Sequence, residues 1–153
     1  MAKVSRSLLI NLTVGLLLAS LPATALALDY RSVAARRAVM YDAPSSQAKK
    51  QHVVGQYYPV EVIVNLGEWI KVRDSSGELA WLESKNLSDK RTVVVTVPRA
   101  EVHVAADAAA AVVFRADKDV VLELVETGAN GWAKVRHRDG LAGYIPALQV
   151  WGL

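Results

Sequence analysis

Histidines, carboxylates and serines are the residues of this chain that could bind a metal or perform catalysis. The sequence has three histidines, His52, His103 and His137, and no cysteine. A zinc site would therefore need carboxylates that folding brings to a histidine from elsewhere in the chain. No spacing in the sequence specifies such a cluster. We expect no metal ion, no cofactor and no disulfide.

Three short segments are similar to parts of catalytic or metal-binding motifs, and each lacks the rest of its motif. His137-Arg138-Asp139 has the order of a kinase catalytic loop, but no glycine-rich loop, strand lysine or Asp-Phe-Gly accompanies it. Asp117-Lys118-Asp119 lacks the glycine and the terminal glutamate of a calcium loop. Nothing around Ser45 and His52 specifies a nucleophile. We interpret the first two segments as polar turns and expect no enzymatic activity.

Binding is better supported than catalysis, by a tryptophan followed at alternate positions by a lysine and an arginine. This Trp-x-Lys-x-Arg pattern occurs at residues 69–73 and 132–136. In a strand the three side chains share one face, where the ring offers apolar area and the cations can meet carboxylates. The alternative is that the tryptophan packs across a hairpin, near Trp81 or Tyr144, with the lysine stem over it. Both hold if only an edge of the ring is exposed.

The pattern belongs to a longer internal repeat. Residues 69–87 reappear as residues 132–150 at a constant offset of 63 positions (132 − 69), without a gap. The tryptophans, lysines, valines and arginines are retained, and so is the glycine at Gly77 and Gly140. A repeat of this kind predicts two copies of one structural unit.

Each copy has the pattern of short strands and polar turns, and no segment shows a helical period. Ile70 and Val72 alternate with the polar positions of their segment, as a half-buried strand requires. We expect residues 28–37 to form a polar lead-in with a solvated Arg36-Arg37 pair, and residues 105–111 to form a loop. The predicted strands are residues 39–41, 53–55, 60–64, 69–73 and 79–82 in the first copy, 92–97 between the copies, and 102–104, 120–125, 132–136 and 143–146 in the second.

These elements predict an all-β protein. About five short strands in roughly sixty residues, without disulfide or metal, must close on themselves to remove exposed edges. So small a unit buries only ~60% of its unfolded surface. We therefore expect contact between the two copies to help stabilise them.

The first 27 residues have the order of a secretory signal peptide. Lys3 and Arg6 precede an apolar run, and small residues end the segment at Ala27. The run is interrupted by Asn11 and Thr13 and is shorter than the ~20 apolar residues of a spanning helix. We expect cleavage after Ala27, a periplasmic or secreted mature protein without a lipidation cysteine, and no stable membrane insertion.

Without that segment the chain is nearly neutral. The whole sequence has 18 basic and 15 acidic side chains, and residues 1–27 contain two of the basic ones, so the remainder carries 16 − 15 = +1. Nucleic-acid binding calls for a basic patch or stripe. We therefore expect no nucleic-acid partner.

The repeated segments resemble a known family. Gly131-Trp132-x-Lys134-Val135, a polar hairpin tip, and Gly143-Tyr144-Ile145-Pro146 resemble the second half of a bacterial SH3 domain, a small β-barrel of secreted and envelope proteins. Glu68-Trp69-x-Lys71-Val72 and Trp81-Leu82 resemble the same half in the first copy. The resemblance covers roughly residues 38–87 and 100–150. It implies two tandem SH3-like β-barrels of about five strands, which we place at residues 28–90 and 91–153.

SH3 domains that bind proline-rich peptides use a groove of two tyrosines, a tryptophan, a proline and a final tyrosine. Alignment on the core valine gives two of the five in each copy, and proline rings dock between paired aromatic walls, so we expect no proline-rich ligand. The aligned groove residues are Tyr41, Ala43, Trp69, Glu83 and Asn86 in the first copy, and Val104, Ala106, Trp132, Pro146 and Gln149 in the second.

The family resemblance implies a binding module, often associated with peptidoglycan or with neighbouring enzymes. We expect a non-enzymatic envelope module that binds cell-wall peptidoglycan or a peptide segment. The alternative is a structural or regulatory partner, an inhibitor or adaptor, of another envelope protein. A small-ligand receptor is disfavoured because barrels of this size are filled by side chains. The candidate binding residues are Trp69, Lys71, Arg73, Tyr41, Trp132, Lys134, Arg136 and Pro146.

Overall fold

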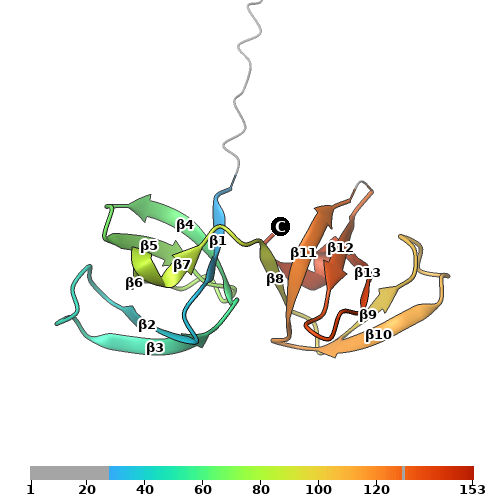
Figure 1. Cartoon of the computed structure of the whole chain (residues 1–153), viewed down its shortest axis with the longest axis horizontal. Coiled ribbons are helices and arrows are strands. Elements are labelled where there is room, and N and C mark those ends of the chain that lie inside the picture. The colour runs from blue at the N-terminus through green and yellow to red at the C-terminus, as the bar shows by residue number, and fades with distance from the viewer. Residues whose placement is uncertain (1–27, 129) are drawn as a thin grey trace, which may run out of the picture.

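The computed structural model describes residues 28–128 and 130–153, which form two antiparallel sheets of seven strands each (Figure 1). Among these residues there is no α-helix, only two 3₁₀ turns, η1 (Ser84–Asn86) and η2 (Ala147–Gln149). The all-β prediction is confirmed, with seven strands per unit where about five were expected. The predicted signal peptide at residues 1–27 lies outside the described residues.

The two sheets have the same strand order. The first runs β3-β2-β6-β5-β4-β1-β7 and the second β10-β9-β13-β12-β11-β8-β14. The strands of the first are β1 (Tyr30–Val33), β2 (Arg37–Tyr41), β3 (Lys50–Gly55), β4 (Pro59–Asn65), β5 (Trp69–Arg73), β6 (Leu79–Glu83) and β7 (Leu87–Ser88). Those of the second are β8 (Thr92–Val95), β9 (Arg99–His103), β10 (Val112–Asp117), β11 (Val121–Thr127), β12 (Trp132–Arg136), β13 (Ala142–Pro146) and β14 (Val150–Trp151).

Each unit has its own core, built on the predicted alternation. Ile70 and Val72 of β5, and Ala133 and Val135 of β12, are completely buried. Their neighbours along the strand face outward, because successive side chains of a strand point to opposite faces. The central strand of each sheet therefore fixes which side chains remain for binding. Residues 105–111 form the predicted loop.

The lead-in prediction for residues 28–37 was wrong in its first half. Residues 30–33 form β1, which pairs with β4 and β7, and Tyr30, Ser32 and Val33 are buried. The Ser32 hydroxyl lies 3.2 Å from the hydroxyl of Ser88, so a polar residue is accommodated inside the sheet. Arg36 and Arg37 are exposed, as expected.

The two copies differ by one residue in a turn, which changes their register. Three residues, 66–68, separate β4 from β5, whereas four, 128–131, separate β11 from β12. Trp81 and Tyr144 are equivalent at an offset of 63, but Tyr41, opposite Trp81, corresponds to His103, opposite Tyr144, at an offset of 62 (103 − 41). The alignment that placed Val104 at the position of Tyr41 was therefore wrong by one residue.

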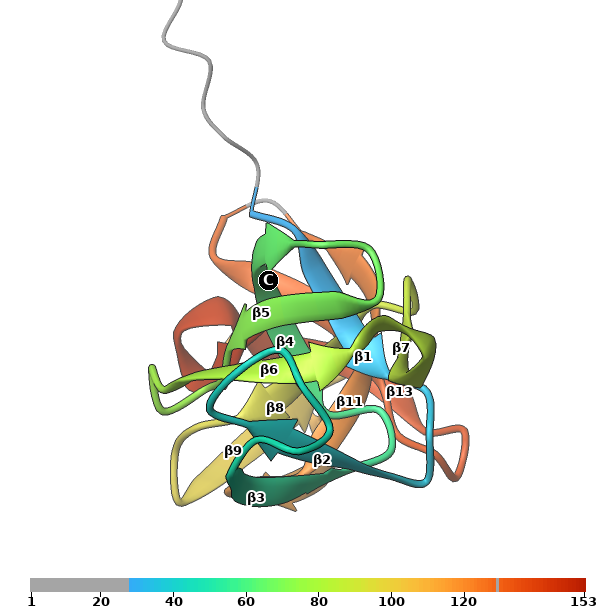
Figure 2. The ribbon, with the colours of Figure 1, turned by 90° about the vertical axis from the view of Figure 1, so that its left-hand side faces the viewer.

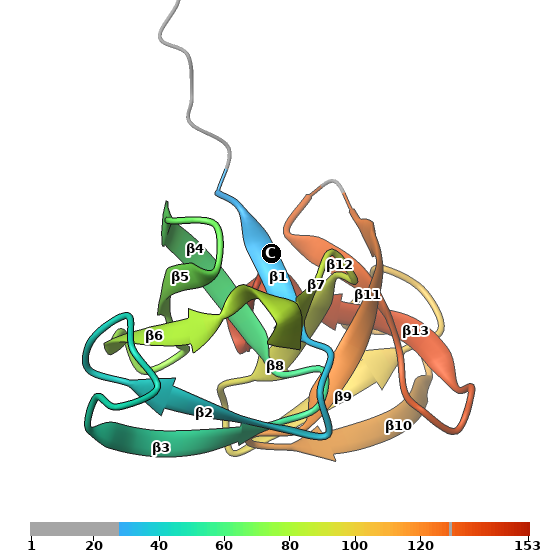
Figure 3. The same cartoon turned by 60° about the vertical axis from the view of Figure 1, so that its left-hand side comes forward.

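The units meet where β8 of the second lies against β4 of the first, beside β1 (Figures 1 and 3). Viewed from the side of the first unit, strands β2 to β6 stand in front of the second (Figure 2). The Thr92 hydroxyl donates a 2.6 Å hydrogen bond to the Tyr57 carbonyl oxygen. Tyr30 meets Trp151 edge-on, with ring centroids 5.2 Å apart. These contacts join the two units directly.

Arg91, in the short connection between the units, adds to this junction. Its guanidinium donates a 2.9 Å hydrogen bond to the Gly152 carbonyl and lies 5.4 Å from the centre of the Tyr30 ring. One side chain thus bridges both ends of the described chain.

Candidate functional site

The two tryptophans of the repeat occupy equivalent positions and are half-buried. Trp69 begins β5 and stands edge-on to Tyr41 of β2, with ring centroids 5.5 Å apart and planes at 86°. Trp132 begins β12 and stands edge-on to His103 of β9, at 5.7 Å and 90°. Edge-to-face packing buries part of each ring and leaves another part in contact with solvent.

His103 is a site residue that the sequence alignment missed. Its side chain is 5% exposed, and Nδ1 lies 2.8 Å from the Ala110 carbonyl oxygen. Because a carbonyl only accepts, Nδ1 carries the hydrogen and donates it. Val104, which the alignment put here, is 59% exposed. An aromatic residue, His103, lies one position before the aligned Val104, and the turn before Trp132 is one residue longer than its counterpart in the first copy. Together these two signals could have revealed His103.

The lysines of the repeat lie over the neighbouring strand and not over the repeat tryptophans. Lys71 Nζ is 5.9 Å from the Trp81 ring centre, and Lys134 Nζ is 5.8 Å from that of Tyr144. These pairs are directly opposite in the β5–β6 and β12–β13 registers. Trp81 and Tyr144 therefore pack under the lysine stems, which leaves the repeat tryptophans to the aromatic pairs on the other side.

The arginines of the repeat have different environments in the two copies. Arg73 donates a 2.9 Å hydrogen bond to the buried carboxylate of Glu61. Arg136 instead lines a pocket between the two units. The predicted Trp-x-Lys-x-Arg face exists along each strand, but the structure does not bring its arginine together with its tryptophan in one site.

A groove of about 480 Å³ opens beside Trp132. Pro146 is directly opposite Trp132 in the strand register, and the pair forms its apolar wall. At its rim, Arg99 is bonded to Asp117, and Glu101 to Arg115, each at 2.9 Å. The groove is lined by Arg99, Glu101, His103, Ala108, Trp132, Pro146 and Gln149.

The first copy has a charged residue where the second has Pro146. Glu83 is directly opposite Trp69, and its carboxylate accepts hydrogen bonds from Lys85 at 3.2 Å and Asn86 at 3.3 Å. A carboxylate beside the ring makes this face more polar than its counterpart. The two copies therefore present different surfaces from one architecture, and Tyr41, Trp69 and Glu83 do not reproduce the apolar wall of the second.

The described residues provide no metal-binding cluster. Among residues 28–128 and 130–153, no group of three or more histidine and carboxylate side chains is placed to hold a metal ion. The triplet at residues 137–139 lies at a hairpin tip, where His137 Nδ1 is 2.9 Å from an exposed Asp139 carboxylate. The Leu141 backbone N–H lowers the pKa of Asp139 below its ordinary value. Over the same described ranges, no helix has the length and apolarity to span a membrane.

Comparison with known proteins adds a family match. A family model described as "Bacterial SH3 domain" matches residues 34–89 and 96–152. None of the curated protein sequences matches the chain.

Three solved structures are similar at low identity. NlpC2 and NlpC1 from Trichomonas vaginalis are 13% and 14% identical, each with a TM-score of 0.38; the matches cover 81% and 82% of this chain, and 48% and 46% of theirs. An NlpC/P60 family protein from Bacillus cereus is 14% identical, with a TM-score of 0.37 and coverage of 79% and 55%. The chain therefore spans about half the length of these proteins.

Proposed function

Because the chain belongs to the bacterial SH3 domain family, with one match in each half, we propose that it is a non-enzymatic binding module of the bacterial cell envelope. Its ligand is cell-wall peptidoglycan or a peptide segment of the envelope. The observation that carries the proposal is the groove of the second copy, where Trp132, Pro146 and His103 form an aromatic and apolar wall. Export through the predicted signal peptide belongs to the same proposal.

The groove suits a short peptide with small side chains. Trp132 and Pro146 offer apolar area to methyl groups, and Gln149, whose amide oxygen is buried without a hydrogen-bond partner, also lines the groove. Aromatic side chains that keep one face exposed are frequent anchors of binding surfaces. The rim cations and carboxylates are already paired with each other. Apolar and backbone contacts therefore supply most of the affinity.

Co-sedimentation with purified cell-wall sacculi tests this function. We expect the protein to be retained and Trp132→Ala to weaken retention by about tenfold, the effect of losing roughly 1.4 kcal/mol at a binding hot spot. Trp69→Ala is the matched control, because it removes the equivalent ring from the first copy. We expect it to retain most of the binding. Circular dichroism must show that both variants fold.

Two results would contradict the proposal. One is the absence of retention by the wild-type protein; the other is equal retention of wild type and a folded Trp132→Ala variant. Co-purification with a single envelope protein, without retention on sacculi, would favour the structural or regulatory partner in its place. Cleavage of peptidoglycan by the purified protein would overturn the non-enzymatic assignment.

A further inference from the structure

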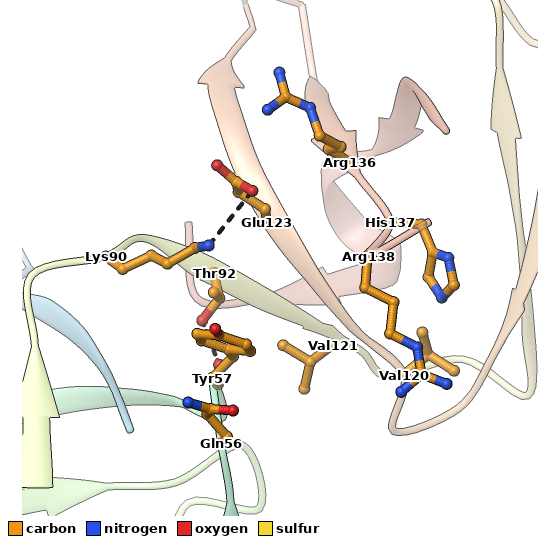
Figure 4. Close-up of a pocket in the computed structure, with 10 residues that line it drawn as sticks. All are labelled: Gln56, Tyr57, Lys90, Thr92, Val120, Val121, Glu123, Arg136, His137 and Arg138. Carbon is orange, nitrogen blue, oxygen red and sulfur yellow. Dashed lines mark hydrogen bonds and ion pairs between the residues drawn. The ribbon is translucent and has the colours of Figure 1, made fainter. Parts of the chain in front are cut away.

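The pocket between the two units, the junction pocket, does not bring its charged groups together. It has a volume of about 550 Å³. Figure 4 shows the guanidinium groups of Arg136 and Arg138 pointing in opposite directions from its ends. Glu123, the carboxylate of its lining, pairs with Lys90 at 3.5 Å. The charges of this pocket therefore do not converge on one group of a ligand, whereas those beside Trp69 in the first copy do.

In the first copy an aromatic pair and a carboxylate lie on one face of the sheet. Trp69 and Glu83 are directly opposite in the β5–β6 register, so their side chains point to the same face. The Tyr41 ring stands at 86° to the indole, with ring centroids 5.5 Å apart. All three side chains are partly exposed. Two aromatic rings and a carboxylate are thus available to one group of a ligand.

An ammonium group already contacts this carboxylate. Lys85 Nζ lies 3.2 Å from Glu83 Oε1, and Asn86 Nδ2 donates a 3.3 Å hydrogen bond to Oε2. The Lys85 side chain is 74% exposed. Exposed ion pairs contribute little to stability, because water and salt screen both charges. An ammonium group of a ligand can therefore take the place of Lys85 at small cost.

Acidic residues flank both rings in the first copy. Asp42 directly follows the tyrosine and Glu68 directly precedes the tryptophan, and both are exposed. The Ser84 backbone N–H donates a 2.8 Å hydrogen bond to the Glu68 carbonyl oxygen, so Glu68 lies beside the strand end that carries Glu83. The second copy is uncharged at the three equivalent positions, which are Val104, Gly131 and Pro146. The acidic surroundings, which attract cations, are therefore a property of the first copy alone.

We propose that Tyr41, Trp69 and Glu83 form a binding site for an ammonium group, such as the amino group of a lysine-type side chain. Aromatic ring faces attract a cation because their quadrupole is negative there. The Glu83 carboxylate accepts a charge-assisted hydrogen bond from the same ammonium group. The second copy has Pro146 in place of this carboxylate and offers an apolar wall. The two copies therefore recognise different chemical groups with one fold.

The proposal does not depend on peptidoglycan binding by the groove of the second copy. The ammonium site consists of residues from β2, β5 and β6, whereas the groove beside Trp132 is lined by residues of the second unit. The Trp69→Ala variant, which should keep most of the retention on sacculi, should lose ammonium binding. Failure of one proposal therefore leaves the other standing.

Nuclear magnetic resonance titration of the ¹⁵N-labelled protein at low salt tests the proposal. The probe is Nα-acetyl-lysine methylamide. Nα-acetyl-norleucine methylamide, which lacks the side-chain amino group, is the neutral control. We expect the lysine probe to shift the indole N–H signal of Trp69 in a saturable manner. The norleucine probe should bind about tenfold more weakly, because it makes no charge-assisted contact.

Matched variants assign the binding to this site. We expect Glu83→Gln, which keeps the side-chain shape and removes the charge, to weaken binding of the lysine probe by about tenfold. Tyr41→Leu removes one ring and should weaken it by about two- to fivefold. Glu78→Gln removes an exposed carboxylate from the opposite end of the β5–β6 hairpin and should bind as wild type does, and so should Trp132→Ala.

Three results would overturn the proposal. The first is an unchanged Trp69 signal in the presence of the lysine probe. The second is equal affinity for the lysine and norleucine probes. The third is a folded Glu83→Gln variant that binds the lysine probe as tightly as wild type does.

Discussion

The imidazole of His103 stands edge-on to the indole of Trp132, with ring centroids 5.7 Å apart and planes at 90°. It repeats, one copy later, the relationship of Tyr41 to Trp69. The Ala110 carbonyl holds the imidazole through Nδ1, so the loop after β9 fixes the ring that supports the tryptophan. The position of the candidate binding ring is therefore determined by a residue on a different strand.

We predict that His103→Ala lowers the free energy of unfolding by about 2 kcal/mol, through loss of the edge contact and the hydrogen bond to Ala110. His103→Phe keeps the edge contact and loses only the hydrogen bond, so it should cost about 1 kcal/mol. Urea unfolding followed by tryptophan fluorescence measures both. Equal stability of His103→Ala and wild type would contradict this account.

The Glu61–Arg73 pair should contribute more to stability than the Glu123–Lys90 pair. The Glu61 side chain is 9% exposed and bonded at 2.9 Å, whereas that of Glu123 is 38% exposed and 3.5 Å from its partner. We expect Glu61→Gln to cost about 1–3 kcal/mol, as for a buried bond to a charged group. Glu123→Gln should cost less than about 1 kcal/mol, as for a surface pair. The midpoints of denaturant unfolding measure both losses of stability. A larger loss in Glu123→Gln than in Glu61→Gln would contradict this ranking.

Gly152 should tolerate no side chain, because it lies at the junction of the units. Its φ is +112°, and an added Cβ would lie 2.8 Å from the Thr92 carbonyl oxygen and 3.2 Å from Pro59 Cβ. Gly140 has a φ of +95° with open space around it, so Gly140→Ala isolates the backbone strain, about 1–3 kcal/mol. We predict a clearly larger loss of thermal stability for Gly152→Ala. Equal losses of thermal stability in the two variants would show that the junction accommodates the added methyl group without further destabilisation.

Tyr30 should make stability fall at alkaline pH. Burial raises its pKa above the ordinary 10.0, and the nearby Glu61 charge adds to this, while Arg91 and Arg73 act against it. A raised folded-state pKa means that its contribution is complete below the unfolded pKa and is lost as pH rises through the folded one. We predict that Tyr30→Phe, which keeps the edge contact with Trp151, loses stability less steeply above the ordinary tyrosine pKa. Thermal melts across this range measure the slopes, and parallel slopes would refute the assignment.

Much of the fold was predictable because the repeat and the strand alternation are local signals. The alternation of Ile70 and Val72 indicated the buried face before any contact was known, and both side chains are fully buried. Strand β1 was not predicted because Arg31 and Ser32 interrupt its apolar pattern. Its burial depends on pairing with β4 and β7, from distant parts of the chain.

The site was less predictable than the fold. Sequence identified Trp132 and Pro146, which lie side by side on neighbouring strands in the apolar wall of the groove. It missed His103, because one extra turn residue shifts the register between the two halves of the copy. The junction pocket has no local signal, since Tyr57 and Arg138 line it together only through packing of one unit on the other.

The most direct test of groove binding uses the indole N–H signals of the four tryptophans, Trp69, Trp81, Trp132 and Trp151. In a nuclear magnetic resonance titration with soluble peptidoglycan fragments, we predict that the Trp132 signal shifts in a saturable manner. Trp151, which packs on Tyr30 at the junction, should remain unchanged. An unchanged Trp132 signal at saturating fragment, or a shift confined to the other three tryptophans, would contradict the account.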